Sequence, residues 1–232
     1  MAAIRGLEKF APKDFPGYIS STIFLGGCNF RCPFCQNPDL VLNPGNLPVM
    51  PQELFFEFID SRKDWLEAVC VTGGEPLVHK DIIKLLSLIK KEGLRIKLDT
   101  NGSFPERLRE IMQKGLIDSA AMDIKATLDK YSLASGIDVN TEDIKKSIDI
   151  LKSSNIEYMF RTTVVPGLIN EKDIELIGKM LEGSPLFQLQ QFSPENTLDE
   201  SYGKIKPYPK EEVKKFGRIA EKYFEKVNLE GV

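Results

Sequence analysis

The sequence predicts an α/β fold built on one mostly parallel sheet. Short apolar segments alternate with longer segments whose apolar residues recur at helical spacing, and the alternation runs through six strand–helix units. Polar residues follow the expected strands, as is typical of α/β folds that bind ligands at the carboxyl ends of their strands. Right-handed crossovers would curl such a sheet, but periodicity alone does not separate an open sheet from a partial barrel.

The expected elements follow in chain order. Residues 1–17 form a lead-in that ends in the turn signal Asp14-Phe15-Pro16-Gly17, and the three prolines of residues 36–50 predict an irregular connection. The expected strands are residues 18–25, 68–72, 96–100, 119–124, 158–165 and 187–192. The expected helices are residues 51–61, 80–92, 105–114, 142–153, 171–181 and 210–224. We expect a single domain over residues 1–232, with its core at 18–192 and a C-terminal loop and helix at 193–232.

Composition narrows the possible partners. The 232 residues are 42% hydrophobic and 28% charged, with a net charge of -3. Without a basic tract, a nucleic-acid partner is not expected, and no apolar run approaches the length of a membrane span. Three of the four cysteines are clustered and no signal peptide is visible, so we expect a cytoplasmic protein in a reducing compartment.

The cysteine cluster is the clearest chemical signal. Cys28, Cys32 and Cys35 have the spacing Cys-x3-Cys-x2-Cys. Thiolates select iron–sulfur clusters, zinc or copper(I), and an electron-transfer 4Fe–4S cluster has four of them. Three thiolates leave one iron open to a substrate or cofactor. The alternative is a structural zinc site, which needs a fourth ligand from Cys70 or His79.

These cysteines, with the aromatic Phe34 before the third, resemble the cluster loop of the radical S-adenosylmethionine (SAM) enzymes. The resemblance implies a partial (β/α)6 barrel, a 4Fe–4S cluster on Cys28, Cys32 and Cys35, and SAM chelated by the open iron. Reduction of the cluster would cleave SAM and release a 5′-deoxyadenosyl radical. No further catalytic side chain is implied.

The strand ends supply the other candidate residues. Gly73-Gly74-Glu75-Pro76 is similar to the second motif of that family, whose glycine backbone contacts SAM, although taken alone it fits a plain turn. By resemblance, the SAM contacts are expected at Phe34, Gly73, Gly74, Glu75, Asp99, Asn101, Lys125 and Arg161. Asp99, Thr100 and Asp123 resemble residues that hold a monovalent cation, Na+ or K+, in glycyl-radical activating enzymes. The alternative is that these polar residues only cap strands and helices.

The longer pattern resembles the activating enzymes of pyruvate formate-lyase and of anaerobic ribonucleotide reductase. It joins Asp14-x-Pro16-Gly17 to the cysteine loop and runs from about Gly6 to Phe192, with Gln36 where activators often have histidine. The resemblance implies a glycyl-radical enzyme as protein substrate, with anaerobic ribonucleotide reductase favoured, and a flavodoxin- or ferredoxin-type electron donor. Two alternatives remain: a radical SAM enzyme for a small molecule, such as a 7-carboxy-7-deazaguanine synthase, and a non-catalytic metal module.

Overall fold

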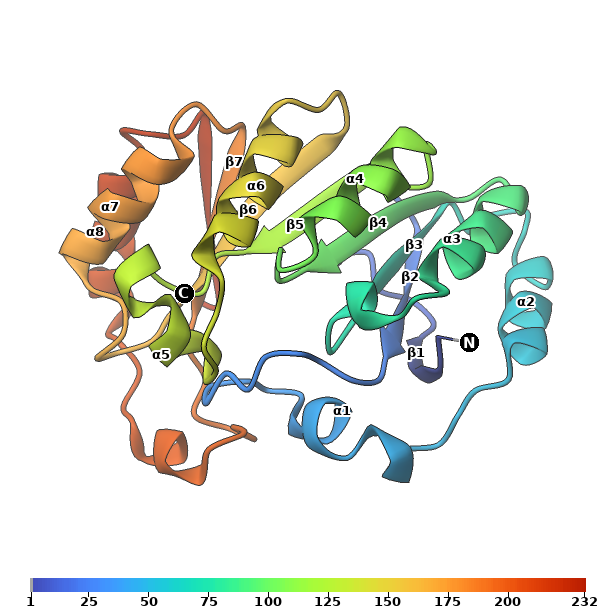
Figure 1. Cartoon of the computed structure of the whole chain (residues 1–232), viewed down its shortest axis with the longest axis horizontal. Helices are drawn as coiled ribbons and strands as arrows, with labels where there is room; N and C mark the ends of the chain where they lie inside the picture. The colour runs from blue at the N-terminus through green and yellow to red at the C-terminus, as the bar shows by residue number, and fades with distance from the viewer. Residues whose placement is uncertain (1) are drawn as a thin grey trace.

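A computed structural model describes residues 2–232 as a single curved sheet with helices packed against it (Figure 1). Its strands lie side by side in chain order, and β1 and β8 at the two ends are not paired with each other. The strands are β1 Ile4–Glu8, β2 Ser20–Leu25, β3 Ala68–Gly73, β4 Arg95–Thr100, β5 Ser119–Asp123, β6 Glu157–Val164, β7 Leu186–Gln191 and β8 Lys226–Glu230. Only the β1–β2 pair is antiparallel. The mostly parallel α/β fold is therefore confirmed.

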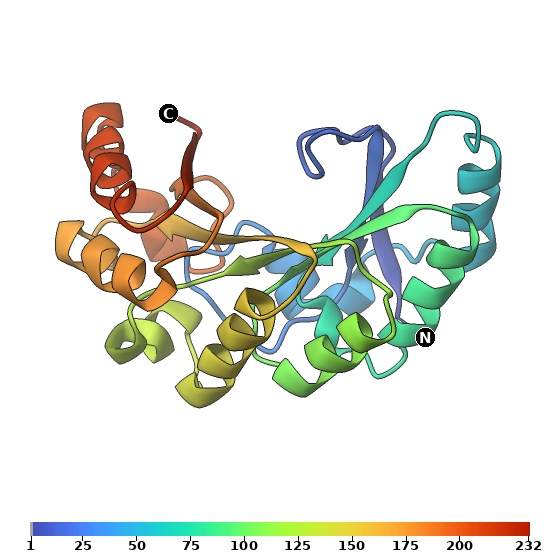
Figure 2. The same ribbon diagram turned by 90° about the horizontal axis from the view of Figure 1, so that it is seen from above.

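The helices connect the parallel strands, and Figure 2 shows α3, α4 and α6 side by side along one face of the sheet. Their bounds are α1 Pro38–Leu42, α2 Gln52–Asp60, α3 Ile82–Lys91, α4 Pro105–Gln113, α5 Tyr131–Ser135, α6 Thr141–Lys152, α7 Glu171–Leu181 and α8 Lys210–Ala220. Local sequence sets several starts: Pro105 opens α4, and Asn170 with Asp173 forms a capping box at α7. No helix in residues 2–232 is long and apolar enough to cross a membrane.

The two faces of the sheet differ in chemistry because successive side chains of a strand point to opposite faces. The face toward the helices is apolar, with Val69 and Val71 on β3 and Ile96 and Leu98 on β4, and the hydrophobic core lies there. The opposite, concave face is polar. Strand register aligns Thr22, Cys70, Lys97 and Ser119 across β2 to β5 on that face. The interior of the partial barrel is therefore available for polar chemistry.

Four helices or strands within residues 2–232 were not predicted. Strand β1 lies in the expected lead-in, helix α1 in the expected irregular connection, and α5 between the expected strand at 119–124 and the expected helix at 142–153. Strand β8 follows the expected terminal helix, which ends at Ala220 instead of 224. Gly6 and a bulge interrupt β1, and β8 has only two apolar residues, so neither carries a clear strand pattern. The six expected strands are β2 to β7, and β1 and β8 extend the sheet at its edges.

Candidate active site

A cavity of about 370 Å³ opens at the carboxyl ends of the parallel strands, where the sequence predicted the ligand site. The loop that contains Cys28, Cys32 and Cys35, here called the cluster loop (residues 26–37), forms one wall. The opposite walls come from strand ends, with Gly73 at the end of β3, Gly74 after it, Asp99 and Thr100 on β4, and Asn101 after β4. Asp123, Lys125 and Arg161 complete the polar lining. Twelve of the thirteen predicted site residues line this cavity, and the thirteenth, Glu75, does not.

The three cluster cysteines are free thiols that all face the cavity, with Cys32 buried and the others partly exposed. The Phe30 amide donates to the Cys28 sulfur at 3.3 Å, a contact that also suits a thiolate. Burial raises the pKa of Cys28 to about 12 and that of Cys32 to about 11, so these thiols are protonated before metal binds. Three thiols that line the same cavity fit a 4Fe–4S cluster with one iron open.

Both candidates for a fourth zinc ligand already contact other groups of the chain. Cys70 is fully buried on β3 with its sulfur 3.7 Å from Asp99 Oδ1, and burial raises its pKa. The His79 ring contacts the Gly26 carbonyl through Nε2 at 2.8 Å. Within residues 2–232, no three Cys, His, Asp or Glu side chains are grouped to hold one metal ion. The donor set therefore favours a cluster over a structural zinc ion.

The Gly73-Gly74-Glu75 motif fastens the end of β3 to the cluster loop. The Gly74 amide donates to the Leu25 carbonyl at 2.9 Å, and the Glu75 amide donates to the Gly27 carbonyl at 2.8 Å. A Cβ on Gly74 would lie 2.1 Å from the Gly27 carbonyl oxygen. The glycines are thus required by this close backbone approach, whichever ligand the loop edge contacts.

Glu75 points away from the cavity and joins two strand ends. Its buried carboxylate accepts hydrogen bonds from the Leu77 amide at 2.9 Å, the Thr100 hydroxyl at 2.8 Å and the Asn101 amide at 2.6 Å. Burial raises its pKa to about 7, against these three donors, which lower it. Glu75 thus supports the turn after β3 and the end of β4, and the SAM contact predicted for it stays a prediction.

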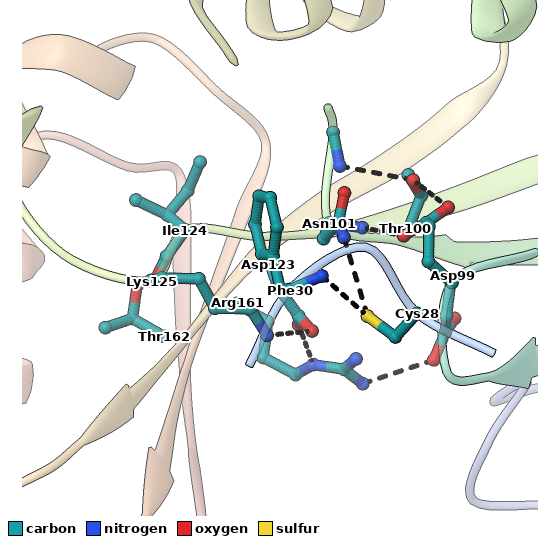
Figure 3. Close-up of polar contacts among 12 residues, drawn as sticks. Cys28, Phe30, Asp99, Thr100, Asn101, Asp123, Ile124, Lys125, Arg161 and Thr162 are labelled. Carbon is teal, nitrogen blue, oxygen red and sulfur yellow. Dashed lines mark hydrogen bonds and ion pairs between the residues drawn. The ribbon is translucent and has the colours of Figure 1, made fainter. Parts of the chain in front are cut away.

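A network of ion pairs occupies the cavity floor (Figure 3). Asp123 accepts from Arg161 Nε at 2.6 Å and from Lys125 Nζ at 2.9 Å. Arg161 Nη1 also donates to Asp99 Oδ2 at 3.3 Å, and Lys97 Nζ contacts Asp99 Oδ1. Burial opposes the charged state of Asp123, but Arg161 and then Lys125 outweigh it and hold its pKa below the usual range. The network holds Asp123 as a carboxylate and pairs Asp99 with two cationic side chains.

Sequence reasoning missed two features of the site. Lys97 is buried on the concave face, and the signal for it is a lysine between the apolar Ile96 and Leu98. The second is the segment 193–199, which closes over the cluster loop. The Leu198 and Asp199 amides donate to the Cys35 and Pro33 carbonyls at 3.0 and 2.9 Å.

Side chains add two contacts between segment 193–199 and the cluster loop. Asn196 Nδ2 donates to the Gln36 carbonyl at 3.1 Å, and Gln36 Nε2 donates to the Ser193 carbonyl at 3.0 Å. Gln36, the departure from the activator pattern, therefore serves to attach the cluster loop. No local sequence signal identifies these contacts, because their partners lie about 160 positions apart.

Comparisons with known proteins agree with this geometry. The radical SAM superfamily model matches residues 22–181. A protein of Methanocaldococcus jannaschii, named as a candidate glycyl-radical enzyme activating enzyme, is 37% identical over 97% of this chain and 95% of its own length. The pyruvate formate-lyase-activating enzyme of Streptococcus mutans is 27% identical over 91% of this chain and 84% of its own.

Two solved structures share the fold at low sequence identity. A domain of a pyruvate formate-lyase-activating enzyme from Bacteroides vulgatus superposes with a TM-score of 0.58 at 22% identity, covering 71% of this chain and 99% of that one. SuiB of Streptococcus suis, bound to its precursor peptide SuiA, gives a TM-score of 0.67 at 16% identity. That alignment covers 88% of this chain and 46% of SuiB.

Proposed function

Since the chain belongs to the radical SAM superfamily, we propose that it activates a glycyl-radical enzyme by removing a hydrogen atom from a glycine Cα of that partner. The observation that carries the proposal is the likeness, over nearly the whole length of both chains, to the Methanocaldococcus jannaschii protein. The shape of the sheet supports it, because β1 and β8 leave the barrel unclosed and a loop of another protein could enter between them.

The chemistry of the cavity also supports a radical reaction at a backbone position. Asp99, Asp123, Lys125 and Arg161 are held in ion pairs, and Asp14 accepts from the Thr22 hydroxyl at 2.5 Å. Every charged side chain that lines the cavity therefore has a partner, and none stands free as a general base. Abstraction of a hydrogen atom needs no base, and a glycine needs no side-chain pocket.

We assign the cofactors to the residues that face the cavity. Cys28, Cys32 and Cys35 would hold a 4Fe–4S cluster, which supplies the electron that splits SAM into methionine and a 5′-deoxyadenosyl radical. The expected SAM contacts that line the cavity are Phe34, Gly73, Gly74, Asp99, Asn101, Lys125 and Arg161. The chain itself binds and orients SAM: cationic Lys125 and Arg161 suit its carboxylate, and the glycine edge leaves backbone groups accessible.

For the partner we propose anaerobic ribonucleotide reductase, because Gly6-Leu7-x-Lys9 and Val164-Val165-Pro166-Gly167 resemble segments of one form of the activating enzymes of that reductase. The electron donor is proposed to be a flavodoxin or ferredoxin. Beyond Cys28, Cys32 and Cys35 the chain has only Cys70, so it has no thiols for a second cluster that could pass electrons to the first.

The test is an anaerobic reaction of reduced, reconstituted protein with SAM and the reductase from the same organism. We expect 5′-deoxyadenosine and a doublet electron paramagnetic resonance signal on the partner, which loses its main splitting when the partner glycine is deuterated at Cα. Cys32→Ala is the negative control, and Cys70→Ala should behave as wild type. If no partner signal forms while a small metabolite stimulates stoichiometric SAM cleavage, the small-molecule function replaces the activase.

A further inference from the structure

The ion-pair network bears on the monovalent cation expected at Asp99, Thr100 and Asp123. That expectation assumes that the two carboxylates lack positive partners within the chain. In the structure each of their four oxygens contacts a protein cation: Lys97 and Arg161 at Asp99, and Arg161 and Lys125 at Asp123. The third expected ligand is also engaged, because the Thr100 hydroxyl donates to Glu75 at 2.8 Å and accepts from the Gly102 amide at 3.1 Å.

Lys97 is the unusual member of this network. It is 4% exposed, and it lies two residues before Asp99 on the same strand, so both side chains share the concave face. Its other polar neighbour is the Cys70 sulfur, 3.8 Å from Nζ. A lysine is rarely buried this completely unless it is paired, and here its partner is one of the two expected cation ligands.

The balance of positive and negative charges around the cavity depends on Lys97. The charged side chains that line the cavity are three carboxylates, Asp14, Asp99 and Asp123, and two cations, Lys125 and Arg161. Lys97, beneath Asp99, brings the number of cations to three. Without Lys97 the same set would lack one positive charge, which is the charge of one Na+ or K+ ion.

We propose that the Lys97 ammonium takes the place of the monovalent cation in this chain, holding Asp99 in position so that SAM binds without Na+ or K+. The inference rests on SAM binding in this cavity but not on the identity of the partner enzyme. Lys97 acts through Asp99 and Arg161, and is therefore a positioning residue. A bound cation would have to displace an ammonium or guanidinium group from one of the two carboxylates.

The test uses the anaerobically reconstituted protein and calorimetric titration with SAM, in potassium chloride and in tetramethylammonium chloride of equal ionic strength. Wild-type affinity should be the same in both salts. Lys97→Met should bind SAM at least about tenfold more weakly in tetramethylammonium, because a charged hydrogen bond is lost, and should recover in potassium. Lys90→Met is the matched control, since Lys90 also pairs with an aspartate but away from the cavity. Its Nζ lies 2.5 Å from Asp118 Oδ2.

A second readout does not need SAM. Potassium should raise the thermal unfolding temperature of Lys97→Met above its value in tetramethylammonium, and it should leave that of wild type and Lys90→Met unchanged. Lys97→Gln, which keeps a donor but no charge, replaces Lys97→Met if that variant does not fold. The proposal would be overturned if the SAM affinity of wild type depended on potassium. It would also be overturned if potassium restored neither SAM binding nor the unfolding temperature of the Lys97 variants. Failure of SAM binding in every salt would refute the proposed function, while the thermal shifts would still decide the role of Lys97.

Discussion

The substitution Gly74→Ala should damage both the fold and the cluster site, because the new methyl group meets backbone on the facing loop. The added Cβ would lie 2.1 Å from the Gly27 carbonyl oxygen and 3.2 Å from Cys28 Cβ. Ordinary contact begins at 3.4 Å, so the backbones must separate by about 1.3 Å. That movement breaks the hydrogen bonds from the Gly74 and Glu75 amides to Leu25 and Gly27.

Two lost hydrogen bonds at about 0.5–1.5 kcal/mol each, with an overpacking cost of about 1–3 kcal/mol, give a destabilisation of about 2–6 kcal/mol. The displaced Cys28 should also reduce cluster loading. Urea unfolding measures the first effect, and iron and sulfide per chain after anaerobic reconstitution measure the second. Gly45→Ala is the matched control, because a Cβ on Gly45 meets nothing within 4 Å. If Gly74→Ala equals this control in both measurements, the close-approach argument is wrong.

Three further predictions concern the cluster cysteines, a buried carboxyl group and segment 193–199. Alanine at any one cluster cysteine should prevent retention of a full cluster, whereas Cys70→Ala should retain it; equal loss of iron and sulfide in Cys70→Ala would make Cys70 a ligand. The pKa of Glu75 is raised from 4.5 to about 7, so between these values the folded chain keeps a proton that the unfolded chain releases. The contribution of Glu75 to the free energy of unfolding should therefore fall by on the order of 3 kcal/mol from pH 4.5 to 7 and then level off. Urea unfolding of Glu75→Gln should not show this fall. Parallel pH profiles of the free energy of unfolding in wild type and Glu75→Gln would contradict the raised pKa. Asn196→Gly allows the left-handed backbone at a φ of 53° but removes the hydrogen bond to the Gln36 carbonyl. The free energy of unfolding should fall by about 1 kcal/mol, and the cluster should be lost faster in air, which its visible absorbance measures. Unchanged decay of the absorbance would show that this bond does not protect the cluster.

The sequence was sufficient for the features that depend on local pattern. Cluster chemistry follows from the spacing of Cys28, Cys32 and Cys35, because three thiols within eight positions remain together in any fold of that loop. The mostly parallel sheet of β2 to β7 follows from the alternation of strand and helix patterns along the chain. Polar residues at the strand ends then meet at one edge, which placed twelve of the thirteen candidate residues in one cavity.

Tertiary structure decided the features that depend on partners distant in the chain. Strand register alone brings Arg161 of β6 between Asp99 of β4 and Asp123 of β5, and it turns Lys97 inward beneath them. The sequence shows these charges but not which of them are neighbours, so the ion pairs at Asp99 and Asp123 were not predicted. Similarly, segment 193–199 reaches the cluster loop across about 160 residues, and its bonds are mostly backbone groups that every residue carries. Such contacts cannot be predicted from residue types, because every non-proline residue has the same backbone donor and acceptor and the course of the backbone determines which of them meet.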